Sequence, residues 1–261
     1  MQELQLVSVG DVLIGGTTKP VNIIALNENG TPCKYILKLF TKKQILQGIS
    51  VAKEIISSEL AKQFNLICPD YGVINFEHSE INNLYGKERL YSLDEGYKFC
   101  SKFIGQSVIF TPLVTKSFLN DYDYANIFAF DFFVYNIDRG GVRKKPNLLI
   151  NDSDLILIDH ELTFSFIDSD KKVDYESYLR NYPYQHHILI KYLKSSRQKK
   201  HLFDEFLEML KVLNLSSLNS TFDGLERLQI PHYEREKFIN YFMWAKQNVT
   251  IFERYLKGMI Q

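Results

Sequence analysis

The sequence has few cysteines, no charge imbalance and no long apolar run. Its three cysteines, Cys33, Cys68 and Cys100, are far apart and form no CxxC pair, so the pattern favours neither a zinc site nor a disulfide framework. Lysine plus arginine equals aspartate plus glutamate, at 31 each. This balance argues against a protein that depends on broad electrostatic attraction to nucleic acid or to an anionic membrane.

Signals for export and membrane insertion are also missing. No apolar segment approaches the ~20 residues that a membrane-spanning helix needs. The start, MQELQLVSVGDVLIGG, lacks the charged beginning, the apolar run and the cleavage site of a signal peptide. We therefore expect a cytoplasmic protein without a membrane span. The basic runs Arg143–Lys145 and Arg197–Lys200 are short, and such a run is usually a solvated face.

Strand patterns dominate the first part of the chain. The β-branched or aromatic runs VSVGDVLIGG, VNIIAL and CKYILKLF are separated by turn residues, which include the hairpin signal Asn29-Gly30. From about Gly48 to Phe64, apolar residues recur at every third and fourth position, and this spacing predicts a helix. Two further strands, YGVINF and YKFCSKFIG, follow.

Helical patterns dominate the second part. Residues 121–135, DYDYANIFAFDFFVY, form a predicted helix that is too apolar all round for a surface position. NLLI and LILI predict a hairpin, and after residue 170 the pattern is mainly helical. We predict an α+β, two-lobed fold, with a β-rich N-lobe that holds one helix at residues 1–105 and a mainly helical C-lobe at 106–261.

Polar residues flank the predicted hairpin. If residues 148–151 pair with 155–158, Asn147 and Asp159 lie directly opposite each other, with Cβ atoms roughly 4.5–5.5 Å apart. An amide oxygen and a carboxylate held that close suit Mg²⁺, although the two residues could simply end a loop and a strand. Asp138, directly after the buried helix, could accept a proton from a hydroxyl or bond its own loop.

A lysine and a glutamate in the first part extend this pattern. Alternation in YILKLF places Lys38 between two large apolar neighbours, so its side chain either reaches a sheet edge or meets an anionic partner. Glu59 lies on the apolar side of the predicted helix, where an acid needs a counter-charge, whereas Glu54 lies among serines. Each placement alone is more often structural, but together they predict a Lys38–Glu59 pair. A strand lysine, a helix glutamate, an aspartate, an asparagine and a strand-end aspartate, in this order, are the parts of phosphoryl transfer in protein kinases.

Several stretches resemble the HipA-like kinase family, particularly its short stand-alone members. FDFFVYNIDR, PNLLI and LILIDHELTF are similar to its Asn-x-Asp-Arg, Asn-Leu-Leu and Ile-Asp-His-Gly motifs, and GGTTKPVNIIAL, SELAKQFNLICPDYGVI and LQIPHYEREKFINYF are similar to other parts of it. The likeness spans nearly the whole chain and is most specific at residues 130–164. Type II phosphatidylinositol kinases have a related pattern, so the resemblance leaves the substrate open.

The resemblance implies a protein-kinase-like fold that binds ATP with Mg²⁺ and phosphorylates a Ser or Thr hydroxyl of a protein. It implies that Asp138 is the catalytic base, that Asn147 and Asp159 are metal ligands, that Lys38 touches the nucleotide phosphates and that Glu59 holds Lys38. A phosphate-side loop and an adenine site are implied at Gly15, Gly16, Thr17 and Thr18, and at Ser101, Lys102 and Phe103.

Two departures from the family pattern motivate other functions. The loop between Asp138 and Asn147 is longer and contains Gly-Gly and three basic residues, and Asp159-His160-Glu161 replaces Asp-His-Gly. The alternatives are a kinase-like nucleotide-binding or regulatory module with little turnover, and a lipid or small-molecule kinase. Larger HipA proteins are toxins bound by an antitoxin, so a toxin or regulatory role and an antitoxin-like protein partner are expected by analogy, whereas direct nucleic-acid binding is not. The histidine pair His186-His187 is expected in an exposed helix or loop.

Overall fold

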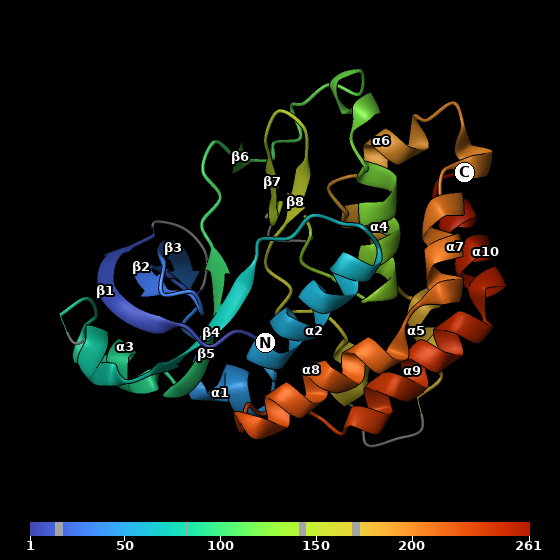
Figure 1. Cartoon of the computed structure of the whole chain (residues 1–261). Coiled ribbons are helices and arrows are strands. Elements are labelled where there is room, and N and C mark those ends of the chain that lie inside the picture. The colour runs from blue at the N-terminus through green and yellow to red at the C-terminus, as the bar shows by residue number, and fades with distance from the viewer. Residues whose placement is uncertain (14–17, 82, 141–144, 169–172) are drawn as a thin grey trace. The chain divides into compact units, whose positions relative to one another are not determined.

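The computed structural model (Figure 1) places the chain in two compact units, which we call unit 1 and unit 2. Each unit combines segments from both sides of residue 105, so the lobes at 1–105 and 106–261 stay a prediction. Unit 1 comprises Met1–Ile55, Pro69–Gly105 and Thr221–His232, and unit 2 comprises Ile56–Cys68, Gln106–Ser220 and Tyr233–Gln261. The structure describes residues 1–13, 18–81, 83–140, 145–168 and 173–261.

Unit 1 is built on an antiparallel sheet with the strand order β1-β2-β3-β5-β4. The Asn29-Gly30 hairpin is confirmed, because Leu26 pairs with Pro32 and Gly30 has a φ of +71°, which glycine adopts without a Cβ clash. The strands are β1 (Gln5–Val12), β2 (Val21–Leu26), β3 (Pro32–Leu37), β4 (Tyr71–Phe76) and β5 (Gly96–Lys102).

Three helices accompany this sheet in the sequence. Ile81, Leu90 and Leu93 pack with the buried side chains of β2 and β3, and this places α3 (Lys87–Ser92) against the core of unit 1. α1 (Lys42–Leu46) begins at a capping box in which Thr41 and Gln44 bond each other's backbone N–H groups. The spacing of apolar residues did not predict α1 or α3, but it predicted α2 (Ser50–Gln63) closely. α2 contributes residues to both units.

The helix α4 (Tyr124–Phe133) lies at the centre of unit 2, and every one of its residues is buried, as its apolar composition predicted. Asp123 caps its first turn by accepting a hydrogen bond from the Asn126 N–H at 3.3 Å. The Phe133 ring packs within 5.5–5.9 Å of the rings of Phe64, Tyr241 and Phe242. Aromatic packing therefore fixes the end of α4 from which the candidate catalytic loop leaves.

The rest of unit 2 is a small sheet and a set of helices. The sheet has the order β6-β7-β8, and α7 contacts α4, α9 and α10. The pattern that predicted late helices is confirmed, with a break at Asn248. The strands are β6 (Val108–Ile109), β7 (Leu148–Ile150) and β8 (Leu155–Leu157), and the helices are α5 (Tyr175–Arg180), α6 (Ile190–Lys194), α7 (Asp204–Val212), α9 (Arg235–Gln247) and α10 (Val249–Met259). The helix α8 (Leu215–Arg227), like α2, contributes residues to both units.

These elements confirm the α+β class, with strands in the first part and helices in the second. Across the described residues, no helix combines the length and the apolar character that crossing a bilayer requires.

Candidate active site

The lysine of unit 1 lies just beyond the last residue of β3. The Lys38 N–H donates to the Phe99 carbonyl at 3.0 Å, so the backbone still follows the sheet. The Lys38 ammonium forms an ion pair with the Glu54 carboxylate of α2, and these residues are only 8% and 1% exposed. Such burial is tolerated for charged groups when they are paired. The prediction that Lys38 points inward and pairs with a glutamate of the following helix is therefore confirmed, although the glutamate is a different one.

The predicted partner, Glu59, was wrong. Its carboxylate pairs with Lys62 of its own helix at 2.7 Å, and the Glu59 side chain is 30% exposed. The error came from treating the serine side of α2 as its solvent side, whereas Ser50, Ser57 and the residues between them are all buried. Small hydroxyl side chains allow close packing, while a solvated helix face usually carries long charged residues. An acid among serines was the signal that could have identified Glu54.

The predicted phosphate-side loop is described only in part. Gly15, Gly16 and Thr17 lie outside the described residues. Thr18 is buried, and its carbonyl accepts a hydrogen bond from Nη2 of Arg89 at 3.2 Å. The base of the loop is closed by the Leu13 N–H, which donates to the Pro20 carbonyl at 2.8 Å.

The predicted adenine-side residues lie at the end of β5. The Ser101 backbone pairs with both β3 and β4. The Lys102 N–H donates to the Asp70 carbonyl at 2.7 Å. Phe103 follows the strand, is 44% exposed, and lies with its ring centroid 4.1 Å from the Lys34 ammonium. This end of the unit 1 sheet therefore presents an exposed aromatic ring beside a cation.

In unit 2, Asp138 and Asn147 are brought into direct contact. The Asn147 Nδ2 group donates to the Asp138 carboxylate at 2.9 Å and to the Asp138 carbonyl at 3.2 Å. The Asn136 side-chain oxygen accepts from the Asp138 N–H at 3.1 Å, so the loop after α4 is held from both sides. Asp138 and Asn147 are 6% and 8% exposed. The sequence-based expectation that they converge is met by this geometry.

The expected position of Asp159, directly opposite Asn147, was wrong by one residue. β7 pairs with β8 as Leu148 with Leu157, and the Ile158 N–H donates to the Asn147 carbonyl at 3.2 Å. A shift of one residue would normally turn a side chain to the other face of a sheet. Here Asn147 and Asp159 have φ angles of +44° and +64°, so both have left the extended conformation and the alternation rule does not apply to them.

Beneath these residues lies a buried ion pair that the sequence analysis missed. The Arg139 guanidinium donates to both carboxylate oxygens of Asp131 on α4, Nε at 2.5 Å and Nη2 at 3.2 Å. Its Nη1 group donates to the carbonyls of Asn147 and Ile158. Arg139 and Asp131 are 1% and 0% exposed. One guanidinium thus connects α4 to the residue before β7 and the residue after β8, at the end of the hairpin where Asn147 and Asp159 lie.

A histidine and an asparagine complete this network around Asp131. The Asp131 carboxylate also accepts from Nε2 of His187 at 3.0 Å and from Nδ2 of Asn136 at 2.8 Å. The prediction that His187 is exposed was wrong, since it is 5% exposed. Its Nδ1 atom accepts from the Leu189 N–H at 3.2 Å, and this bond requires the neutral ring that carries its proton on Nε2.

The pKa shifts follow from these contacts. Burial alone would raise the pKa of the Asp131 carboxyl, but the Arg139 charge and the His187 hydrogen bond outweigh it and hold that pKa below its ordinary range. Burial lowers the pKa of His187, and the hydrogen bond and charge of Asp131 offset only part of this effect. Asp131 is therefore ionised and His187 neutral at pH 7. A single carboxylate inside the apolar run FAFDFFVY was the sequence signal for this network.

The oxygen atoms near the hairpin ends suit a hard cation. Because Nδ2 of Asn147 faces Asp138, its Oδ1 atom is directed away from Asp138 and can serve as a ligand. This amide oxygen and the Asp159 carboxylate are the types of oxygen ligand that Mg²⁺ accepts, together with substrate phosphates and water. Within the described ranges, no group of three or more His, Cys, Asp and Glu side chains could hold a metal ion by itself.

The fold and these side chains define a class of protein. A buried strand-end lysine paired with a helix glutamate, and an aspartate, an asparagine and a second aspartate around a hairpin, are the parts of protein-kinase-like phosphotransferases. The model of the HipA-like kinase family matches residues 32–214, more than half of the chain. The chain belongs to the HipA-like kinase family, and the resemblance seen in its sequence is confirmed.

The crystal structure of the proinflammatory kinase CtkA from Helicobacter pylori is similar over 98% of this chain and 95% of its own, with 11% sequence identity and a TM-score of 0.49. The search of curated proteins gave no match. The family assignment therefore rests on the family model.

Proposed function

We propose that this HipA-like kinase transfers the γ-phosphoryl group of ATP, with Mg²⁺, to a Ser or Thr hydroxyl of a protein. The observation that carries the proposal is the contact of Asn147 with the buried Asp138 carboxylate, at a hairpin end that Arg139 ties to α4. Positioning of this kind is the main contribution of a protein to phosphoryl transfer, because the reaction needs little covalent chemistry from the enzyme.

Asp138 is the proposed general base. Its carboxylate accepts the proton of the substrate hydroxyl while the hydroxyl oxygen bonds to the γ-phosphorus, and the bond from that phosphorus to the bridging oxygen breaks to release ADP. The bonds from Asn147 and Asn136 fix the loop, so the carboxylate needs no reorganisation before it acts. The Oδ1 atom of Asn147 and the Asp159 carboxylate would hold Mg²⁺, which neutralises the charge of the phosphates.

The residues of unit 1 are proposed to bind the nucleotide. Lys38 contacts its phosphates, and Glu54, in place of Glu59, orients the Lys38 ammonium. The segment Gly15–Thr18 covers the phosphates, and Ser101–Phe103 lies beside the adenine. The exposed Phe103 ring supports the last assignment, because an aromatic face stacks well on a base.

The acceptor and the partner remain proposals by analogy with the family. A toxin or regulatory role with an antitoxin-like partner would suit a protein kinase of this family, and no feature of the described residues favours the lipid or small-molecule alternative. The low-turnover alternative makes a distinct prediction, namely nucleotide binding without transfer.

The proposal is tested by incubating the purified protein with γ-labelled ATP and Mg²⁺, alone and with a cell lysate, and identifying labelled Ser or Thr by mass spectrometry. We expect Asp138→Ala to lower the transfer rate about 10²–10⁴-fold, the usual contribution of a general base, and Asp159→Ala to lower it at least as much. Asp152→Ala, in the exposed turn of the same hairpin, is the matched control and should keep wild-type transfer. Absence of transfer by the wild type, or equal transfer by the Asp138 and Asp152 variants, would refute the proposal.

A further inference from the structure

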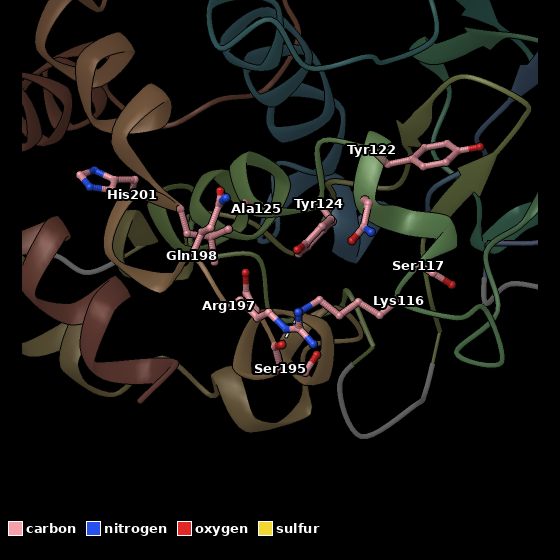
Figure 2. A pocket seen from close by; sticks show the side chains of 12 residues that line it. Lys116, Ser117, Tyr122, Tyr124, Ala125, Ser195, Arg197, Gln198 and His201 are labelled. Atoms are coloured by element: carbon pink, nitrogen blue, oxygen red, sulfur yellow. Dashed lines mark hydrogen bonds between the residues drawn. The ribbon is translucent and has the colours of Figure 1, made fainter.

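Unit 2 contains a second candidate site, a cavity of about 800 Å³ (Figure 2). We call it the Arg197 pocket. Its walls come from two segments, residues 116–125 before and at the start of α4, and residues 195–202 after α6. Pockets of roughly 300–1,000 Å³ are the usual size for small-molecule ligands. The cavity is thus large enough for an organic ligand and is not a packing defect.

The pocket is cationic. Lys116 and Arg197 line it, and no Asp or Glu belongs to its described lining. The Lys116 ammonium donates to the Ser195 carbonyl, which leaves further N–H donors on a group that has three. Figure 2 shows the Lys116 and Arg197 side chains reaching toward the same part of the pocket. The basic run Arg197–Lys200, expected to be a solvated face, therefore contributes its first residue to a cavity.

Two acidic residues close to the pocket are already engaged. The Asp204 carboxylate lies 2.7 Å from Nδ1 of His201, and the Asp123 carboxylate accepts from the backbone and side chain of Asn126 at 3.3 and 3.1 Å. Among the described residues, neither Lys116 nor Arg197 has a carboxylate within ion-pair distance. Two cations that face one cavity without a counter-charge favour an anionic ligand.

The Arg197 pocket is separate from the candidate catalytic loop. Tyr124 and Ala125, at the first turn of α4, line the pocket, whereas Asp138 follows the last turn. Ten helical residues at 1.5 Å each place these two ends ~15 Å apart. A group bound beside Tyr124 and Ala125 therefore lies at the opposite end of α4 from the candidate catalytic loop.

We propose that the Arg197 pocket binds a phosphomonoester. The guanidinium of Arg197 offers the planar pair of N–H donors that matches two phosphate oxygens, and Lys116 adds a point charge. A phosphomonoester carries about −1.5 to −2 charges at pH 7, which balances two cations better than one carboxylate does. The remaining volume and the nearby Tyr124 ring accommodate the organic part of the ligand. This inference concerns binding only and does not depend on the proposed kinase activity.

The test is isothermal titration calorimetry of the full chain with three probes at equal ionic strength: inorganic phosphate, glycerol 1-phosphate, and a blocked tripeptide that contains phosphoserine. We expect saturable binding of at least one phosphomonoester. The double variant Lys116→Gln with Arg197→Gln should weaken it about 10- to 100-fold or more, as expected for the loss of charged hydrogen bonds. Tighter binding of the tripeptide would indicate that the natural ligand is a phosphorylated protein segment. Tighter binding of glycerol 1-phosphate would indicate that it is a free metabolite.

A matched control separates this site from general surface charge. The double variant Lys194→Gln with Lys200→Gln removes the same charge from neighbouring exposed positions that do not line the pocket, and it should bind like the wild type. The inference is wrong if no probe binds, if the Lys116–Arg197 double variant binds as well as the wild type, or if the Lys194–Lys200 double variant loses binding to the same extent.

Discussion

Glu54 and Glu59 lie on the same helix, yet their carboxylates have different surroundings. Glu54 is 1% exposed and pairs with the buried Lys38 ammonium. Glu59 is half-buried and pairs with Lys62, whose side chain is 50% exposed. Removing one partner from a buried ion pair leaves the other charge in a medium of low polarity, whereas an exposed pair is screened by water. The two residues therefore form a matched pair for mutation.

We expect Glu54→Gln to lower the free energy of unfolding by about 3–5 kcal/mol, and to raise the KM for ATP because the Lys38 ammonium loses its orienting carboxylate. Glu59→Gln should change the free energy of unfolding by no more than ~1 kcal/mol. Urea denaturation measures the first quantity, and transfer rates at varied ATP concentration measure the second. Equal effects of the two substitutions would contradict the assignment of Glu54.

At the scale of elements, the helix α4 and the hairpin β7–β8 are joined by charge as well as by packing. The Arg139 guanidinium donates to Asp131 and to the Asn147 and Ile158 carbonyls, so one side chain joins the two elements. His187, in contrast, is neutral in the folded protein and donates to the same carboxylate. His187, on the segment between α5 and α6, is therefore a member of this network whose pKa burial lowers.

The stability of the protein should rise between pH 5 and pH 7. Burial holds the folded-state pKa of His187 below its unfolded value, which is about 6.5. As the pH falls below that value, the unfolded chain binds a proton that the folded chain does not, so the free energy of unfolding decreases. Asp131, with its pKa also lowered, contributes a loss only below about pH 4, where unfolded aspartate becomes protonated.

Urea denaturation at pH 5, 6 and 7 measures this dependence. His187→Gln keeps an N–H donor for Asp131 but removes the titrating ring, so the increase in stability from pH 5 to pH 7 should become smaller. His201→Gln, at an exposed position, should retain the wild-type increase. An identical pH dependence in the wild type and in the His187 variant would show that this histidine is not the titrating group.

At the scale of the whole molecule, the proposed nucleotide site should be visible in thermal unfolding. A ligand that binds only the folded state, at 100 times its dissociation constant, adds about 2.7 kcal/mol of stability, and this corresponds to a Tm increase of roughly 5–10 °C for a chain of this size. We expect ATP with Mg²⁺ to produce such an increase, and ATP with a chelator to produce a smaller one.

Two variants test whether this increase in Tm comes from the proposed nucleotide site. Lys38→Met should reduce the shift relative to its own ligand-free Tm, because the phosphate contact is lost. Lys62→Gln, which disrupts only the exposed Glu59 pair, should keep the full shift. A shift that is the same with and without Mg²⁺, or the same in the Lys38 and Lys62 variants, would argue against the proposed roles of Asn147, Asp159 and Lys38.

Local sequence patterns were sufficient for many of the elements, although not for α1 or α3. Alternation and turn residues predicted the β2–β3 hairpin, apolar spacing predicted α2 and the late helices, and the composition of DYDYANIFAFDFFVY predicted a fully buried α4. The motifs around Asp138, Asn147 and Asp159 were sufficient to suggest the HipA-like family, which the family model confirms. These inferences succeeded because periodicity, turn chemistry and motif spacing depend on neighbours a few residues apart.

Only the tertiary structure decided which side chains meet. Glu54 pairs with Lys38 in preference to Glu59 because of which faces of α2 are covered. The pairing register of β7 with β8 depends on the turn between them, and the alternation of apolar residues predicted that register with an error of one residue. The Asp131–Arg139–His187 network joins residues up to 56 positions apart in the sequence. The Arg197 pocket is formed by residues 116–125 and 195–202, which are also far apart in the sequence. Sequence spacing carries no information on such distances, because burial and long-range ion pairs are set by how the whole chain packs.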